Sequence, residues 1–296
     1  MEFAFTQEQD ELRREARSFL EANADAPLAD LRELGWLGVS VPEERGGGGL
    51  SFVDEAILFE EAGRALYTGP FLTTAVVLPA LAEVDDNAWS LEVDGLVPHL
   101  GAVDKVLRAD MTSVPAEGET LDTMDETRPL GRLSAGESGG AQDDFEPVRL
   151  RLLAALALEA VGVAQKALEL GVEYVSTREQ FGKKIGTYQA VSHPLADTYV
   201  ETELARSLAY WAAWCVAHES EQHGEQAPVA VVVAAAKAQA AETAVAACER
   251  SIQVHGGIGF TWEHVLHRYY KRAQWIDAFG GHAAAQRRLV AAHLLD

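Results

Sequence analysis

Hydrophobic positions recur at helical spacing near the start of the chain. Thr6 and Gln9 form a predicted capping box, and similar apolar spacing predicts further helices over residues 31–37 and 55–67. Four glycines at residues 46–49 interrupt this pattern. The run lacks the Lys-Ser/Thr ending of a phosphate-binding loop, so we expect a turn there. The apolar stripe of the first predicted helix contains Leu12, Ala16, Phe19 and Leu20.

The helical pattern returns at residue 148 and persists to the end of the chain. Long helices joined by short polar connections pack as antiparallel four-helix bundles, which is the fold that we expect here. The Ala-rich stretch at residues 229–247 is apolar on too many faces for a surface helix, so we expect it to be buried on both sides. The predicted helices cover residues 148–177, 198–218, 229–252 and 283–295.

The residues between these helical parts have a different character. Short alternating runs predict strands near residues 93–98, 103–107 and 118–122, and residues 134–144 read as a flexible connector. The fold class is therefore mostly α, with three predicted domains. These are an N-terminal helical domain (1–90), a reduced β domain with its linker (91–147) and a C-terminal four-helix bundle (148–296).

Composition and net charge argue against some classes of function. A formal net charge of -22 argues against a nucleic-acid partner, because neutralising phosphates needs a basic face. No apolar run approaches the roughly 20 residues that span a bilayer, and the start has no signal peptide, which predicts a cytoplasmic protein without membrane contact. Cys215 and Cys248 lack metal-ligand spacing and read as reduced core thiols. His264 and His267 form no zinc pattern, so we expect no metal.

Two motifs lie between the long helical segments. The first is TREQFGKKIG at residues 177–186, and the second is QVHGGIGF at residues 253–260. With LGWLG at residues 34–38 near the start, they make the chain resemble the acyl-CoA dehydrogenases over nearly its whole length. That family consists of flavoenzymes that desaturate acyl-CoA thioesters.

The resemblance implies a site for FAD. Arg178 and Phe181 match family residues that contact the pyrophosphate and adenine end of an FAD held mainly by a neighbouring subunit. The planar fork of an arginine suits phosphate oxygens, and glycines let the main chain approach a ligand closely. A single glycine would suffice to end a helix, so the Gly256-Gly257 pair indicates more than a cap. The other expected FAD-binding residues are Ile185, Tyr188, Gln189, Gln253 and His282, the last where the family often has Thr.

The catalytic base that the family requires has no counterpart here. Alignment from Gly259 and Phe260 places Gly280 where the commonest family members carry a glutamate. A second version of the family carries this glutamate on the first bundle helix, at a place that falls near Leu152. Glu159, about two turns further along that helix, is the nearest acid. We therefore expect no catalytic residue in this chain, with Glu159 kept as an open alternative.

The middle domain is also shorter than the family's, without the Trp-Ile-Thr-like segment that holds the flavin ring. These departures make the chain resemble the short subunit of heteromeric acyl-CoA dehydrogenases from actinobacterial steroid degradation. In such α2β2 complexes a full-length partner supplies the base and the flavin cradle, and the substrate is the CoA ester of a steroid side chain. The family also implies an electron-transfer flavoprotein as redox partner.

Two other functions stay open at this point. The chain is alternatively a self-sufficient dehydrogenase with an unusual base such as Glu159. A third reading is a scaffold or a CoA-ester binding homologue without flavin.

Overall fold

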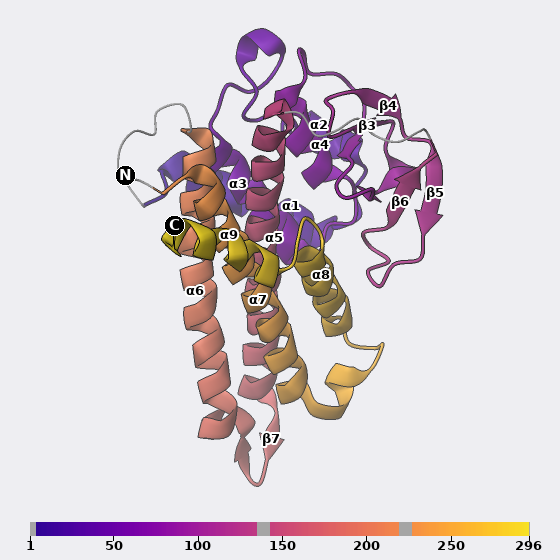
Figure 1. Ribbon diagram of the computed structural model, residues 1–296. Coiled ribbons are helices and arrows are strands. Elements are labelled where there is room, and N and C mark those ends of the chain that lie inside the picture. The colour runs from indigo at the N-terminus through magenta and orange to yellow at the C-terminus, as the bar shows by residue number, and fades with distance from the viewer. Residues whose placement is uncertain (1–3, 135–142, 219–226, 296) are drawn as a thin grey trace.

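The computed structural model describes residues 4–134, 143–218 and 227–295. Its parts follow one another along the chain as N-terminal helices, a small piece of short strands and a long helical bundle (Figure 1). This arrangement confirms the mostly α-helical fold. Most of the predicted connector at residues 134–144 lies outside the described residues.

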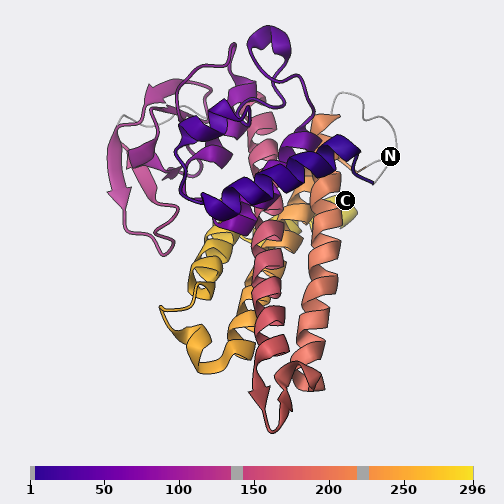
Figure 2. The same ribbon diagram turned by 180° about the vertical axis from the view of Figure 1, so that it is seen from behind.

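Four α-helices make up the N-terminal part: α1 (Gln7–Ala22), α2 (Leu28–Glu33), α3 (Phe52–Ala65) and α4 (Phe71–Val77). The predicted capping box of α1 is confirmed, because Thr6 and Gln9 exchange side-chain-to-backbone bonds. α1 lies across the bundle (Figure 2), where Arg13 donates to the Tyr210 hydroxyl at 2.9 Å. The glycine run forms the predicted turn, and a Cβ on Gly47 would lie 2.2 Å from the carbonyl oxygen of Val41.

The middle part contains β1 (Trp89–Leu91), β2 (Val97–Pro98), β3 (Lys105–Leu107), β4 (Ser113–Pro115), β5 (Gly118–Leu121) and β6 (Leu130–Leu133). They form two three-stranded sheets with the orders β1-β3-β4 and β2-β6-β5. Only the β1–β3 pair is parallel among these pairings. β2, β3 and β5 fall within the predicted ranges and β1 lies just before the first of them, whereas β4 and β6 lie outside the predicted ranges.

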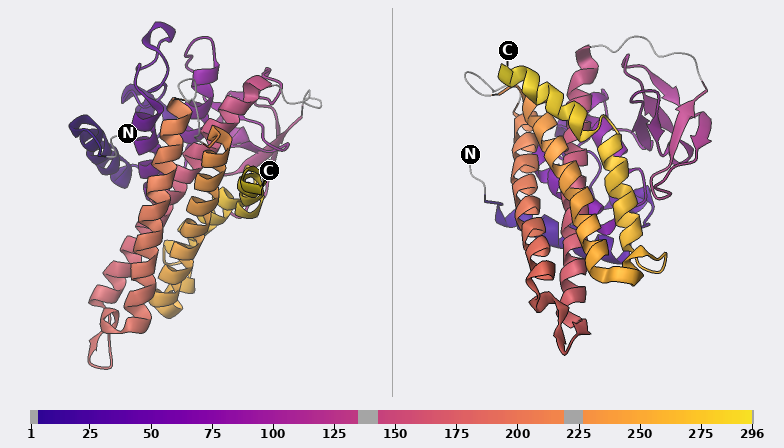
Figure 3. Two further views of the ribbon diagram at one scale, coloured as in Figure 1. Left: turned by 60° about the vertical axis from the view of Figure 1, so that its left-hand side comes forward. Right: turned by 60° about the horizontal axis from the view of Figure 1, so that its bottom comes forward.

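The bundle part contains α5 (Glu146–Thr177), α6 (Gln189–Ala217), α7 (Val229–His255), α8 (Leu266–Ala278) and α9 (Ala283–Leu295). α7 contacts α5, α6, α8 and α9, so the Ala-rich helix is buried as expected. α6 begins at Gln189, earlier than predicted, because Pro194 lies inside its second turn rather than ending it. α8 is a full helix that packs against α5 and α7, whereas α9 lies across α7 (Figure 3).

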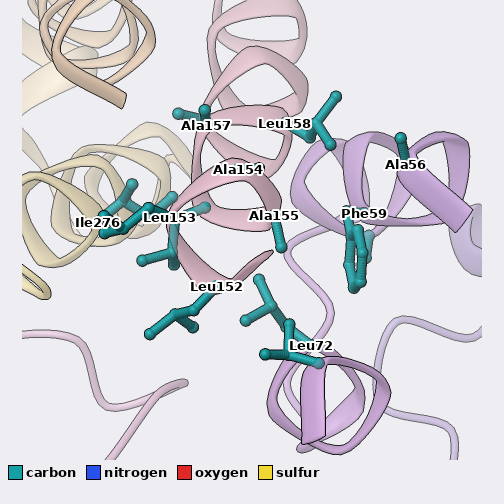
Figure 4. Packing of buried hydrophobic residues seen from close by; sticks show 14 of the residues in the cluster. Ala56, Phe59, Leu72, Leu152, Leu153, Ala154, Ala155, Ala157, Leu158 and Ile276 are labelled. Carbon is teal, nitrogen blue, oxygen red and sulfur yellow. The ribbon is translucent and has the colours of Figure 1, made fainter. Parts of the chain in front are cut away.

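Glycines stand where α3 and α5 cross. A Cβ on Gly63 would lie 2.1 Å from the carbonyl oxygen of Glu159, and one on Gly162 would lie 1.9 Å from that of Glu60. The two backbones therefore touch, which only glycine permits. Side chains from α3, α4, α5 and α8 fill the surrounding core (Figure 4), including Phe59, Leu72, Leu153 and Ile276.

One helical stretch corrects an expectation from composition. Val229–Phe260 has 32 residues and is long and apolar enough to cross a membrane, although no such run was expected. Of the most apolar 18-residue segment of this stretch, 61% is buried inside the protein. This burial fits the position of α7 among four other helices, because core helices of bundles are apolar on several faces.

Candidate functional site

The two sequence motifs meet at one end of the bundle, where α5 ends, α6 begins and α7 ends (Figures 1 and 3). Ile185 of the first motif and Val254 of the second pack against the same small buried cluster. The rings of Tyr174 and His255 stack with their centroids 4.2 Å apart. We call this region, residues 174–189 and 253–260, the clamp end.

A hairpin projects from the clamp end. Its strands are β7 (Glu179–Gln180) and β8 (Lys183–Lys184), and Phe181 and Gly182 between them have φ values of 53° and 77°. Positive φ at both central residues is typical of a type I′ turn, which matches the twist of a hairpin but normally uses Asn or Gly at its first position. A phenylalanine there costs on the order of 1–3 kcal/mol of strain. The side chain is nevertheless 93% exposed, so the chain itself gains no burial from it.

Basic groups surround this aromatic tip. Arg178 is exposed, and within the described residues its guanidinium has no hydrogen-bond partner, while its carbonyl oxygen accepts from Ile185 N at 2.9 Å. Lys183 Nζ lies 4.1 Å from the centre of the Tyr188 ring. The backbone of Arg178 is therefore fixed at the base of the hairpin, and its exposed guanidinium keeps its donors available to an anion from outside.

The glycines of the second motif divide into two kinds. A Cβ on Gly259 would lie 2.6 Å from the carbonyl oxygen of Ile252, so Gly259 is required by packing. Gly256 has a φ of 61°, which favours glycine. Gly257 has neither constraint, because a Cβ there would meet nothing within 4 Å. The close approach of something outside the chain would explain this glycine.

The other predicted site residues differ in exposure and in location. Ile185 and Tyr188 are half-buried at the base of the hairpin, and Gln189 is the exposed first residue of α6. Gln253 is exposed on the last turn of α7, one turn before the glycine pair. The clamp end thus collects eight of the nine predicted residues; the ninth, His282, lies elsewhere.

His282 follows α8 at the helix end opposite the clamp end, about 20 Å away along a 13-residue helix. Its Nδ1 lies 2.6 Å from Asp277 Oδ2, and this hydrogen bond helps hold the pKa of Asp277 below its ordinary value against the opposing effect of burial. Lys237 Nζ donates to the carbonyl oxygen of Ile276 at 2.6 Å. These contacts fix the corner between α8 and α9, so His282 does not share one binding surface with the clamp end.

The expected position of the base is filled by an apolar side chain. Gly280 has a φ of 71°, and a Cβ built on it would lie 2.8 Å from Leu153 Cδ2. Leu152 and Leu153 on α5 are completely buried. The two alternative base positions of the sequence comparison therefore adjoin in space, and neither presents an acid.

Glu159 is buried between two arginines. Its side chain is 1% exposed, and its oxygens accept from Arg128 at 2.5 and 2.6 Å and from Arg272 at 2.7 Å. Arg272 also pairs with Asp125 at 2.6 Å. Both Glu159 oxygens are occupied, so this carboxylate does not fit the part of a substrate base. We call Asp125, Arg128, Glu159 and Arg272 the buried charge cluster.

The buried charge cluster joins the middle part to the bundle. Burial and the like charge of Arg272 lower the pKa of Arg128. Burial alone would raise the pKa of Asp125, but Arg272 and Thr127 hold it below its ordinary value. In the sequence Arg272 stands with Arg268 and Lys271, a spacing typical of a basic surface patch, but Arg272 is completely buried.

An apolar groove of about 630 Å³ runs beside the hairpin between α5 and α6. Sequence patterning did not reveal it, because its residues also satisfy the helical period of the bundle. Tyr199 and Val200 on α6 are 57% and 55% exposed on its rim. Lys184 and Gly186 of the first motif line the same groove, so it is continuous with the clamp end.

Comparisons with known families match most of the chain. The description "Acyl-CoA dehydrogenase, N-terminal domain" matches residues 6–84, and "Acyl-CoA dehydrogenase, C-terminal domain" matches residues 151–295. The acyl-CoA dehydrogenase IpdE2 of Mycobacterium tuberculosis is 34% identical over 81% of this chain and 77% of its own length. The acyl-CoA dehydrogenase FadE34 of the same organism is 36% identical over 92% of this chain, which spans only 43% of FadE34.

Solved structures with the same fold include two named as pairs of proteins. The ChsE4-ChsE5 complex from Mycobacterium tuberculosis superposes with a TM-score of 0.85 at 21% identity, covering 100% of this chain and 99% of the other. The Tcur3481-Tcur3483 steroid ACAD superposes with a TM-score of 0.80 at 24% identity, covering 97% and 98% of the two chains.

Proposed function

Because the chain belongs to the acyl-CoA dehydrogenase family, we propose that it is a non-catalytic subunit that completes the FAD site of a full-length partner. The family consists of FAD-dependent oxidoreductases. In this proposal the clamp end binds the adenosine and pyrophosphate part of the FAD, and the partner holds the flavin ring and supplies the base. The observation that carries the proposal is the hairpin, which exposes an aromatic residue in a strained conformation near Arg178, an arginine without a side-chain partner among the described residues.

The residues of the clamp end fit this part of FAD. Arg178 would donate paired, charge-assisted hydrogen bonds to the pyrophosphate. Phe181 offers a ring face on which the adenine can lie, because a planar ring stacks well on an aromatic side chain. Gly256 and Gly257 leave the main chain open to the adenosine half. Bound FAD would supply the acceptor for the hydride that leaves the acyl chain.

The filled base position supports a division of labour between two chains. A glutamate at position 280 would have to displace Leu153 and adopt a positive φ. Glu159 is engaged by Arg128 and Arg272 and does not replace it. Within the described residues, the self-sufficient alternative therefore has no candidate base at either of the two positions that the family uses.

The partner in this proposal is a full-length acyl-CoA dehydrogenase subunit, in an α2β2 complex. The apolar groove and the rim residues Tyr199 and Val200 favour a protein partner at the clamp end, because interface cores are depleted in charge and enriched in aromatic residues. The substrate that we propose is a CoA ester of the steroid type, by analogy with the relatives named above. His282 remains a separate prediction, since the clamp end does not include it.

The test is the visible spectrum of the chain purified alone and after co-purification with a full-length family member from the same genome. We expect a colourless chain alone, and a yellow complex that bleaches when an acyl-CoA substrate is added. A yellow chain that bleaches by itself would favour the self-sufficient dehydrogenase. Colourless preparations in both cases would favour the scaffold or CoA-ester binding function.

A further inference from the structure

The segment that joins α7 to α8 has little apolar burial to hold it in place. It covers residues 256–265 and begins with the glycine pair of the second motif, and we call it the glycine turn. Its largest apolar side chains, Phe260 and Trp262, are mostly exposed. Other contacts must therefore fix the turn to the bundle.

A stack of three rings makes this attachment. The ring of Tyr174 on α5 stacks on that of His255, the last residue of α7, and the His255 ring lies 4.4 Å from the ring of His264 in the glycine turn, centre to centre. The carbonyl oxygen of His264 accepts from His267 Nδ1 at 2.8 Å. His264 thus connects the turn to α5 and α7 through its ring and to α8 through its backbone.

Hydrogen bonding fixes the protonation state that this attachment requires. The backbone N–H of Leu266, the first residue of α8, donates to His264 Nδ1 at 3.3 Å. A backbone N–H can only donate, so this ring nitrogen carries no proton. Protonation would replace the acceptor by a donor. It would also put a positive charge at the N-terminus of α8, where the helix dipole disfavours cations.

The groups that face His264 also oppose a positive charge on its ring. His255 approaches it from α7 and His267 from α8. Burial, together with the like charges of His255 and His267, lowers the pKa of His264. The tyrosine of the ring stack, from α5, adds no charge.

Charged side chains further from the ring do not compensate. Lys271 follows His267 by four residues on α8, and residues four apart share a helix face, so it adds a cation there. Glu263 and Arg268 are exposed and have opposite charges. Within the described part of the chain, no carboxylate forms an ion pair with His264. A protonated His264 would therefore find repulsion and no partner.

We propose that His264 is a positioning residue of the glycine turn, which it holds against α7 and α8 only while its ring is uncharged. Acidification would then open the turn. The consequence for flavin rests on the proposed function, in which the turn presents Gly256 and Gly257 to the adenosine half of FAD. An open turn would release flavin from the complex.

The first test uses the isolated chain, without flavin. Hydrogen exchange of residues 256–266 is measured at pH ~7.5 and ~5.5, on either side of the ordinary histidine pKa, and corrected for the intrinsic exchange rate at each pH. We expect opening to increase by roughly three- to tenfold at the lower pH, because the open turn binds a proton more readily than the closed one. The middle of α7 should show no such increase.

His264→Asn tests the role of the ring nitrogen. The side-chain oxygen of asparagine accepts from a backbone N–H two residues on and cannot be protonated, so this variant should keep the turn closed at both pH values. His264→Phe retains a ring without an acceptor and should open the turn at both. The matched control is His293→Asn, at an exposed position of α9, which should open at the lower pH as the natural chain does.

Equal protection of the natural chain at the two pH values, or the same pH dependence in His264→Asn, would overturn the proposal. The second test measures flavin bound to the complex with the full-length partner at the same pH values. We expect the natural complex to lose flavin at the lower pH and the His264→Asn complex to retain it. Acid-induced opening with unchanged flavin retention would support the positioning role of His264 and contradict the flavin contact of the turn, so the two ideas fail separately.

Discussion

Arginine side chains have opposite surroundings in two regions of this protein. In the buried charge cluster, Arg272 is completely buried and each of its charged neighbours is paired within the chain. At the clamp end, Arg178 is exposed without a partner in the described part of the chain, next to a phenylalanine that is 93% exposed. The donors of Arg272 are therefore paired inside the protein, whereas those of Arg178 are available to a ligand.

This difference distinguishes charged residues that stabilise the fold from charged residues that are available for binding. Burying ions is costly, and a buried network is retained when removing one member would leave another unpaired. An exposed arginine can be replaced without leaving a buried charge unpaired. The strained backbone at Phe181 is expected to persist only where a function such as ligand binding requires that residue. The four predictions below test this separation, in order of decreasing effect on the stability of the chain.

Glu159→Gln should have the largest effect. It removes one charge from a buried cluster and leaves Arg128 and Arg272 without their shared partner, so we expect a loss of about 3–5 kcal/mol in the free energy of unfolding. Urea denaturation of the isolated chain measures this loss. The matched control is Glu173→Gln at an exposed position of the same helix, which should change stability by less than about 0.5 kcal/mol. Equal effects of the two substitutions would show that the cluster is not structural.

Lys237 should make stability depend on pH. Burial lowers its pKa from 10.5 to about 8, so between these values the unfolded chain binds more protons than the folded one. The free energy of unfolding then rises with pH through this range, by on the order of 2 kcal/mol up to pH ~10. Thermal unfolding of Lys237→Met beside the natural chain, from pH ~7 to ~10, isolates this contribution. Parallel curves for the two proteins would contradict it.

The helical period predicted most of the fold. It located α1, α5, α7 and α9, because long amphipathic or apolar segments carry a strong signal. It missed most of α8, because Arg272 has the polarity of a surface residue and interrupts the apolar pattern, although its side chain is buried. It also placed the start of α6 too late, since Pro194 looks like a break. Neither the buried position of Arg272 nor the tolerance of Pro194 is visible in local sequence.

The sequence indicated one part of the candidate site and not another. The family resemblance carried by the two motifs indicated the clamp residues, and their binding of FAD stays a prediction. The buried charge cluster was not predicted, since Arg128, Glu159 and Arg272 come together only through the packing of the middle part, α5 and α8. Glu159 therefore looked available as a base until its partners were known.

Phe181→Asn should stabilise the chain while weakening the clamp. Asn adopts the left-handed conformation more readily than Phe, and Asn-Gly is the preferred type I′ pair, so we expect a gain of about 1 kcal/mol in the free energy of unfolding. The complex with the partner should lose flavin more readily under dilution. A gain in stability with unchanged flavin retention would mean that Phe181 does not touch the nucleotide. An unchanged stability would mean that the strain at this position is smaller than the geometry indicates.

Arg178→Ala should change stability least, by less than about 0.5 kcal/mol, because the side chain is exposed and unpaired in the described structure. Arg14→Ala, at an exposed position of α1, is the control. The decisive measurement is the ratio of bound flavin to protein in the complex of each variant with the full-length partner, taken from its visible spectrum after gel filtration. We expect the Arg178→Ala complex to assemble and to retain flavin at least about tenfold more weakly than the control. An assembled Arg178→Ala complex with full flavin occupancy would contradict the clamp role.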